Sequence, residues 1–152
     1  LEGFQAGLSW RTVLAKREAF RAAFEGFSPD AVAAFSTVDV ERLTRDPGII
    51  RNRRKIEAVI SNAHATLAMR NTSEATDGPS HLGEFVWSYR PMHDPRPRSH
   101  NEVPTQLPES VALAADLKSR GFKFVGPTTM LALMAAIGIV NTDIVGTHRR
   151  PR

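Results

Sequence analysis

The stretch Asp46-Pro47-Gly48-Ile49-Ile50-Arg51-Asn52-Arg53-Arg54-Lys55 lies between two segments with helical periodicity, Thr37 to Arg45 and Arg53 to Arg70. Proline disfavours the helical conformation at the residue before it, so the first helix should end near Asp46. Gly48 can adopt the positive φ that a tight reversal needs. The two isoleucines that follow can pack beneath the helices. The stretch therefore predicts two helices joined by a compact hairpin, over about residues 37–70.

Four cationic side chains follow the isoleucines within five positions: Arg51, Arg53, Arg54 and Lys55. The N-terminus of a helix offers free backbone N–H groups and the positive end of the helix dipole, both of which favour anions. Together these features are typical of a helix-hairpin-helix, which binds the nucleic-acid backbone without reading sequence. An ordinary helical connection with a solvated basic face explains the same residues, so the local pattern leaves both interpretations open.

The composition indicates one compact globular domain. The chain has 152 residues, of which 41% are hydrophobic and 24% charged, and a net charge of +4 that suits a polyanionic partner. The absence of cysteine excludes disulfides, thiolate nucleophiles and cysteine-based zinc sites. No apolar run has transmembrane length and no signal-peptide pattern is present, so we expect a cytoplasmic protein with no membrane partner.

Periodicity along the rest of the chain predicts an all-α fold without internal repeats. A helix from Ser9 should bury Trp10, Val13, Leu14, Phe20 and Phe24 on one stripe. Further helices are expected over Pro29–Phe35, Leu82–Tyr89, Ser110–Arg120 and Thr128–Ile139, the last being the most apolar and therefore central. The segment Phe122–Val125 is the only candidate strand. The proline-rich segment 90–108 should be a long surface loop, and the basic tail 147–152 should be frayed.

Glu2 and Trp10 are candidates for binding a planar base. A carboxylate near an aromatic plane can hydrogen-bond to base nitrogens while the ring stacks on the base. A cationic base would also compensate the desolvation of the carboxylate. The ordinary interpretation is a solvated glutamate and a core tryptophan. No histidine pair has metal-binding spacing, and no nucleophile-elbow or nucleotide-binding motif occurs.

Three blocks carry a resemblance to a known family: LEGFQAGLSW at the start, DPGIIRNRRKIEAVISNA in the middle, and RGFKFVGPTT followed by GIVN near the end. In this order and spacing they resemble the 3-methyladenine DNA glycosylase I family, from Leu1 to about Gly146. The resemblance implies a helix-hairpin-helix glycosylase fold. It also implies base excision repair, in which the N-glycosidic bond of 3-methyladenine in alkylated double-stranded DNA is hydrolysed to leave an abasic site.

The resemblance also implies roles for individual residues. Glu2 matches the glutamate that hydrogen-bonds the excised base, and it is the expected catalytic residue; Trp10 matches the stacking tryptophan. Ala6-Gly7-Leu8 matches the loop that approaches the DNA, so Gly7 and Leu8 are expected DNA contacts. The hairpin residues expected to bind DNA are Gly48, Ile50, Arg51, Arg53 and Lys55. No lysine stands at the hairpin turn where related lyases carry one, so we expect a monofunctional, monomeric hydrolase.

The chain departs from the family pattern at two places. The family has a segment before the position of Leu1 that contributes a cysteine, a histidine and tyrosines to the site, and its absence would remove part of the pocket wall. Near the end, Asp143 and Thr147 stand where the family has a histidine and a cysteine of its zinc site, with His148 adjacent. A zinc site needs four suitable ligands, so we expect no cofactor and no metal. These departures keep two alternatives open: a catalytically weakened DNA-binding relative, and a helical domain that binds an acidic protein.

Overall fold

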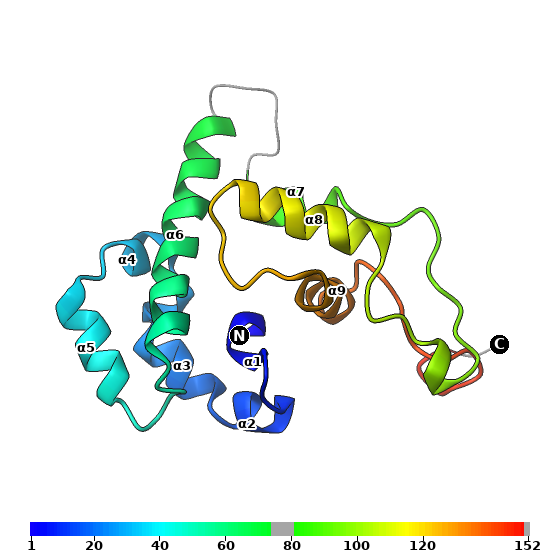
Figure 1. Cartoon of the computed structure of the whole chain (residues 1–152), viewed down its shortest axis with the longest axis horizontal. Coiled ribbons are helices and arrows are strands. Elements are labelled where there is room, and N and C mark those ends of the chain that lie inside the picture. Colours follow the sequence, from blue (N-terminus) through cyan, green and yellow to red (C-terminus); the bar gives the residue numbers. More distant parts are fainter. Residues whose placement is uncertain (74–80, 151–152) are drawn as a thin grey trace.

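The computed structural model describes residues 1–73 and 81–150, and within them the chain is helical (Figure 1). The described residues form no strand, only an isolated bridge between Thr147 and Arg150. The elements are α1 (Glu2–Gln5), α2 (Trp10–Ala15), α3 (Arg17–Ala23), η1 (Glu25–Phe27), α4 (Pro29–Ala33), α5 (Thr37–Arg45), α6 (Arg53–Ser73), α7 (Leu82–Trp87), η2 (His100–Glu102), α8 (Pro108–Ser119) and α9 (Pro127–Ala136). The predicted all-α fold class is confirmed.

The hydrophobic core has two parts, and α6 contributes to both. One cluster joins α1, α3, α4, α5 and the hairpin, and the other joins α7, α8, α9 and the segments around them. Ala63 belongs to the first cluster and Ala65 to the second. Residues two apart lie about 200° apart around a helix of 3.6 residues per turn, so α6 buries two opposite faces. Figure 1 shows α4 and α5 on one side of α6 and α7–α9 on the other, with α1 and α2 on the same side as α9. We refer to α1–α5 as the N-terminal lobe and to α7–α9 as the C-terminal lobe.

The hairpin between α5 and α6 forms where the sequence predicts it. Asp46 is extended, as expected before proline, and its Oδ1 accepts a 2.7 Å hydrogen bond from the backbone N–H of Gly48. Ile49 is buried in the N-terminal cluster, and Ile50 packs partly against it. The helix-hairpin-helix therefore rests on an apolar contact beneath its turn.

The reason for glycine at position 48 differs from the prediction. Its φ does not lie in the left-handed region. A Cβ there would lie 3.2 Å from the Cβ of Ala19 and 2.9 Å from Oδ1 of Asp46. Gly48 is thus required because α3 approaches the hairpin closely, and not because the turn needs positive φ.

The predicted helix from Ser9 is divided at Lys16 into α2 and α3. Val13, Phe20 and Phe24 are buried as predicted, whereas Leu14 is 53% exposed because the division takes it off the common stripe. The ammonium of Lys16 donates to the carbonyl oxygens of Pro47 (2.9 Å) and Gly48 (3.1 Å). The division at Lys16 thus coincides with a bond that holds the hairpin against α2 and α3.

The C-terminal lobe follows the predicted helices to within a few residues, and α9 buries Met130, Leu131 and Met134. The segment Phe122–Val125 forms no strand. Instead, the side chain of Asn62 on α6 accepts from the N–H of Lys123 at 2.7 Å and donates to its carbonyl at 3.1 Å. The amide side chain of Asn62 thus satisfies the backbone N–H and carbonyl of Lys123, which a neighbouring strand would satisfy in a sheet.

The tail is ordered over residues 147–150, contrary to the expectation that it frays. The guanidinium of Arg150 donates to the carbonyl oxygens of Pro95 (2.6 Å), Asn141 (3.0 Å) and Asp143 (3.4 Å). The bond to Pro95 attaches the tail to the loop 90–108, which is irregular apart from η2, as predicted, and the other two attach it to the segment after α9. Residues 151 and 152 lie outside the described part of the chain. No helix among the described residues is both long and apolar enough to cross a membrane.

Candidate functional site

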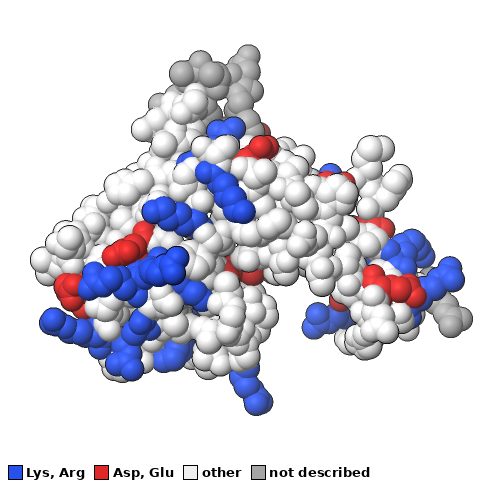
Figure 2. Space-filling model, viewed as in Figure 1, with Lys and Arg blue, Asp and Glu red and all other residues white. Residues whose placement is uncertain are grey.

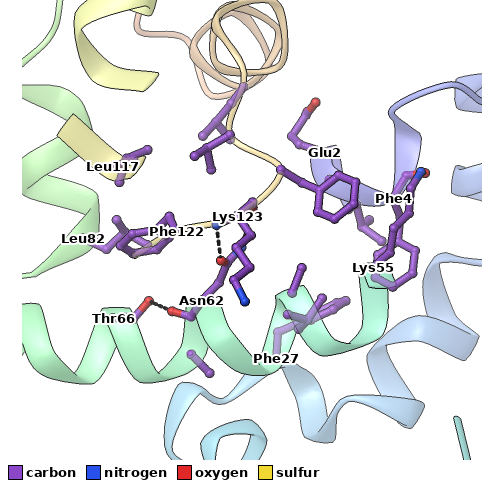
Figure 3. A pocket seen from close by; sticks show the side chains of 18 of the residues that line it. Glu2, Phe4, Phe27, Lys55, Asn62, Thr66, Leu82, Leu117, Phe122 and Lys123 are labelled. Carbon is purple, nitrogen blue, oxygen red and sulfur yellow. Dashed lines mark hydrogen bonds between the residues drawn. The ribbon is translucent and has the colours of Figure 1, made fainter. Parts of the chain in front are cut away.

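A cavity of about 420 Å³ lies between the two lobes, next to α1 (Figure 3). Its walls come from α1, η1, α4, α6, α7, α8, α9 and the segment Phe122–Val125. Most of the lining is apolar, and the charged side chains that reach it are Glu2, Lys55 and Lys123. An apolar cavity with a few polar groups is the usual form of a small-molecule site in a protein.

Glu2 is the acidic residue of this cavity. It begins the four-residue helix α1, which packs against α9, and its side chain extends towards α9 in Figure 3. The Oε2 atom is buried and has no hydrogen-bond partner among the described residues. Burial disfavours the charged form and raises the pKa of the Glu2 carboxyl above its ordinary value. A buried acceptor without a partner is suited to a ligand that brings its own donor.

The turn after α1 separates Trp10 from Glu2. Gly7 adopts a positive φ of 81°, which glycine tolerates without strain, and the Leu8 N–H donates to the Gln5 carbonyl at 2.7 Å. Gly7 and Leu8 are both exposed on this turn, and a contact with DNA requires such exposure. Trp10 lies half-buried at the start of α2 and is absent from the residues that line the cavity with Glu2. The structure therefore does not bring the predicted base-binding pair together in one cavity wall.

The exposed cations of the hairpin differ in their partners. Arg53 forms ion pairs with Glu41 of α5 and, at 3.7 Å, with Glu57 of α6. The hydrogen bond from Arg53 lowers the pKa of the Glu41 carboxyl. Arg51 and Arg54 are exposed, and the described residues provide no acidic partner for either. Figure 2 shows Lys and Arg side chains gathered over the N-terminal lobe on this face.

Lys55 does not occupy the exposed, phosphate-binding position that the sequence predicts for it. Only 8% of the residue is exposed, and its ammonium points inward to the carbonyl oxygens of Phe4 (2.9 Å) and Ala6 (2.6 Å). Burial lowers the pKa of the Lys55 ammonium. The cause is helical phase: Ile56 next to it is buried in the N-terminal core, and Lys55 lies on the side of α6 that faces α1. Of the hairpin cations, Arg51, Arg53 and Arg54 face the solvent.

The sequence interpretation missed Phe124, which also lines the cavity. Its backbone has a positive φ of 57°, which is uncommon for a bulky residue and often marks a functional segment. Its Cβ lies 3.4 Å from where a Cβ on Gly3 would stand. The block RGFKFVG pointed to this segment, but neither periodicity nor composition shows that it meets α1.

The residues near the expected metal position surround a second pocket. Asp143, Thr147, His148 and His100 line a small pocket between the tail and the loop 90–108. Within residues 1–73 and 81–150, no three His, Cys, Asp or Glu side chains are placed to hold one metal ion.

Comparison with known proteins gives consistent matches over the whole chain. A family model described as methyladenine glycosylase matches residues 1–150. The chain is 49% identical to DNA-3-methyladenine glycosylase 1 of Escherichia coli over 149 residues, which is 96% of this chain and 76% of that protein. A crystal structure of 3-methyladenine DNA glycosylase I superposes with a TM-score of 0.89 at 47% identity, covering 99% of this chain and 80% of the other. A variant of such an enzyme in complex with 3-methyladenine superposes with a TM-score of 0.86 at 32% identity, covering 99% of this chain and 79% of the other.

The raised pKa of Glu2 predicts a pH dependence of stability. A carboxyl with a raised pKa binds its proton more tightly in the folded state, so its favourable contribution is complete below the ordinary value of 4.5 and is lost as pH rises through the folded-state pKa. Replacing Glu2 by Gln removes the ionisable group and therefore removes this loss of stability at higher pH. Urea denaturation from about pH 4 to about pH 8 should therefore show the variant gaining free energy of unfolding over the parent as pH rises. The exposed Glu25→Gln controls for net charge, and the same pH trend in this control would contradict the assignment to Glu2.

Proposed function

The chain belongs to the methyladenine glycosylase family, and we propose that it excises 3-methyladenine from alkylated double-stranded DNA by hydrolysing the N-glycosidic bond. The observation that supports this most directly is that Glu2, whose Oε2 atom is buried without a hydrogen-bond partner among the described residues, is one of the residues lining a largely apolar cavity. Relatives named as glycosylases for this base, and a solved relative in complex with it, agree with the proposal.

The chemistry of the base explains why one carboxylate suffices. A 3-methylated adenine is cationic while it is bonded to the sugar and leaves as a neutral molecule. The leaving group is already activated, so no strong general acid is required. Glu2 would accept a hydrogen bond from the extruded base, and the cationic charge of the base would favour the ionised carboxylate. Discrimination then comes from the pocket, since an unmodified adenine carries no such charge.

The hairpin supplies a grip on the DNA that is independent of sequence. At the start of α6, the N–H of Lys55 is bonded to the Asn52 side chain, and the preceding N–H groups of Arg53 and Arg54 begin the helix. The N–H groups of Arg53 and Arg54 and the dipole of a long helix favour binding of a backbone phosphate. The exposed cations Arg51 and Arg54 favour it too. Gly7 and Leu8 would contact the duplex near the vacated base position.

Two finer points extend the proposal. The hairpin turn from Asp46 to Asn52 has no lysine, so we propose that the enzyme is monofunctional and leaves the abasic strand intact. Trp10 is proposed to stack on the base from the start of α2, which rests on the resemblance of LEGFQAGLSW to the family's motif. The enzyme is proposed to act as a monomer.

Release of free 3-methyladenine from methylated duplex DNA tests the function directly. The parent chain should release the base and leave the abasic strand uncleaved. Glu2→Gln should slow release by about 10²-fold or more, because it removes a charge that interacts with the cationic base, while affinity for abasic duplex stays nearly unchanged. Unchanged release by the variant would remove Glu2 from the site. Salt-sensitive DNA binding without any release by the parent would favour a catalytically weakened relative. Neither release nor DNA binding would favour the protein-interaction domain.

Arg51→Gln tests the phosphate contact at the hairpin. The substitution should weaken binding to all duplex sequences alike and reduce the salt dependence of log K by about one unit, as expected for the loss of one phosphate contact. Titration of labelled duplexes at several salt concentrations measures both quantities. The exposed Lys118→Gln on α8 makes the same change in net charge and should leave the slope unchanged. A loss confined to particular sequences would contradict a backbone contact.

We propose further that the chain works without a bound metal. The side chains at the expected position comprise one carboxylate, one hydroxyl and histidines, with no thiolate, which is a poor donor set for a structural zinc ion. Atomic absorption or plasma mass spectrometry of the purified chain should find zinc well below one ion per molecule, and chelation should leave the melting temperature unchanged. Stoichiometric zinc, or a melting temperature that falls with chelator, would contradict this proposal.

A further inference from the structure

Lys55 has an arrangement that binding of DNA phosphate does not explain. It is the third residue of α6, two positions after the first exposed arginine of that helix, yet it is one of the few buried charged residues of the described chain. Its ammonium donates to the carbonyl oxygens of Phe4 and Ala6, at 2.9 Å and 2.6 Å. Among the described residues no carboxylate pairs with it within ion-pair distance.

The two carbonyls belong to the C-terminal end of α1 and the residue after it. The last carbonyl groups of a helix have no partner inside the helix and carry the negative end of its dipole, so a cation is favourable there. A helix of four residues has almost no stability of its own. The orientation of α1 must therefore come from contacts outside it, and two charge-assisted hydrogen bonds from one buried ammonium are strong contacts of this kind.

The two hydrogen bonds connect Lys55 to the segment that carries the residues proposed for base excision. Phe4 is two residues after Glu2, and Ala6 directly precedes the exposed turn at Gly7 and Leu8. Lys55 itself directly follows the arginines that face the solvent at the hairpin. One side chain therefore ties the helix that binds the DNA backbone to the helix that carries the cavity carboxylate.

Phe124 adds a contact from the C-terminal lobe. The Lys55 ammonium lies 5.9 Å from the centre of the Phe124 ring, within the range of a cation–π interaction. Phe124 lines the same cavity and lies against Gly3 of α1. The Lys55 ammonium therefore lies where hairpin, α1 and the opposite cavity wall meet.

We infer that Lys55 is a positioning residue for base excision: it holds α1 so that the Glu2 carboxylate has a fixed place relative to the DNA gripped by the hairpin. This inference rests on the proposed excision activity. A displaced α1 would leave the hairpin able to bind DNA but would misplace Glu2, and misplacement by about 1 Å can cost on the order of 10²-fold in rate. Loss of Lys55 should thus slow release while leaving the salt-dependent phosphate contacts of the hairpin in place.

Lys55→Met and Arg54→Met form a matched pair of neighbouring substitutions with the same loss of charge. Single-turnover release of 3-methyladenine at saturating enzyme, and affinity for abasic duplex at several salt concentrations, are measured for each. Lys55→Met should slow release by on the order of 10²-fold, with a nearly unchanged salt slope of binding. Arg54→Met should reduce the affinity and lower the salt slope by about one.

Chemical rescue separates positioning from packing. The chain has no cysteine, so Lys55→Cys introduces a single thiol, which can be alkylated with bromoethylamine in the unfolded state before refolding. The product carries an ammonium at nearly the length of lysine. It should recover most of the release rate, whereas alkylation with iodoacetamide, which adds a neutral group, should not. Equal recovery with both reagents would overturn the role of the charge.

Three results would overturn the inference. They are unchanged release by Lys55→Met, loss of affinity and salt slope like that of Arg54→Met, and recovery with the neutral group. If circular dichroism shows that the Lys55 variants do not fold, the ¹⁵N-labelled parent decides. The Lys55 ammonium resonance should keep its chemical shift and slow hydrogen exchange when abasic duplex is added, and scalar coupling to a DNA phosphorus would contradict the inference. The same release assay measures the parent. If the parent itself released no 3-methyladenine, the result would contradict the proposed function and not the role of Lys55.

Discussion

The helix α6 buries two opposite faces, and the arrangement of the molecule depends on this constraint. Ile56 and Ala63 pack into the N-terminal cluster, while Ala65 and Met69 pack into the C-terminal one. A helix that is apolar on one stripe can belong to one layer only. Because α6 serves both clusters, the two lobes are held on either side of it, and the space next to its first turns becomes a cavity lined by both.

The first residues of α6 connect the exposed surface of the hairpin with this cavity. Successive residues of a helix point about 100° apart, so a short run of cations cannot all face the same way. Arg53 and Arg54 face the solvent and the expected DNA, while Lys55 faces α1 and Ile56 enters the core. These four successive residues thus point to the solvent, to α1 and into the core. Lys16 performs a comparable task from the other side, since its ammonium binds the carbonyl oxygens of the hairpin turn.

Local signals predicted much of the fold and part of the site. The proline of the hairpin and the spacing of apolar residues act between residues close in sequence, and they placed α4, α5, α7, α8 and α9 to within a few residues. The division at Lys16 was not visible from local spacing, and it coincides with hydrogen bonds from the Lys16 side chain to carbonyl groups 31 and 32 residues away. Likewise, Asn62 and the segment around Lys123 are 61 residues apart, and no periodicity links them. The ordered tail at Arg150 also depends on carbonyl groups distant in sequence.

The sequence by itself determined the helical class, the hairpin, the family resemblance and the choice of Glu2, because each depends on residue type and short spacing. Only the tertiary structure decided the direction in which each charge points. It buried Oε2 of Glu2 without a partner, turned Lys55 from the DNA to α1, brought Phe124 to the cavity, and left Trp10 outside that cavity's lining. The physical reason is that the burial of a charge depends on what packs against it. For α1, which is too short to hold itself in place, those neighbours include Phe20 of α3 as well as Lys55 and Phe124, which lie much further along the chain.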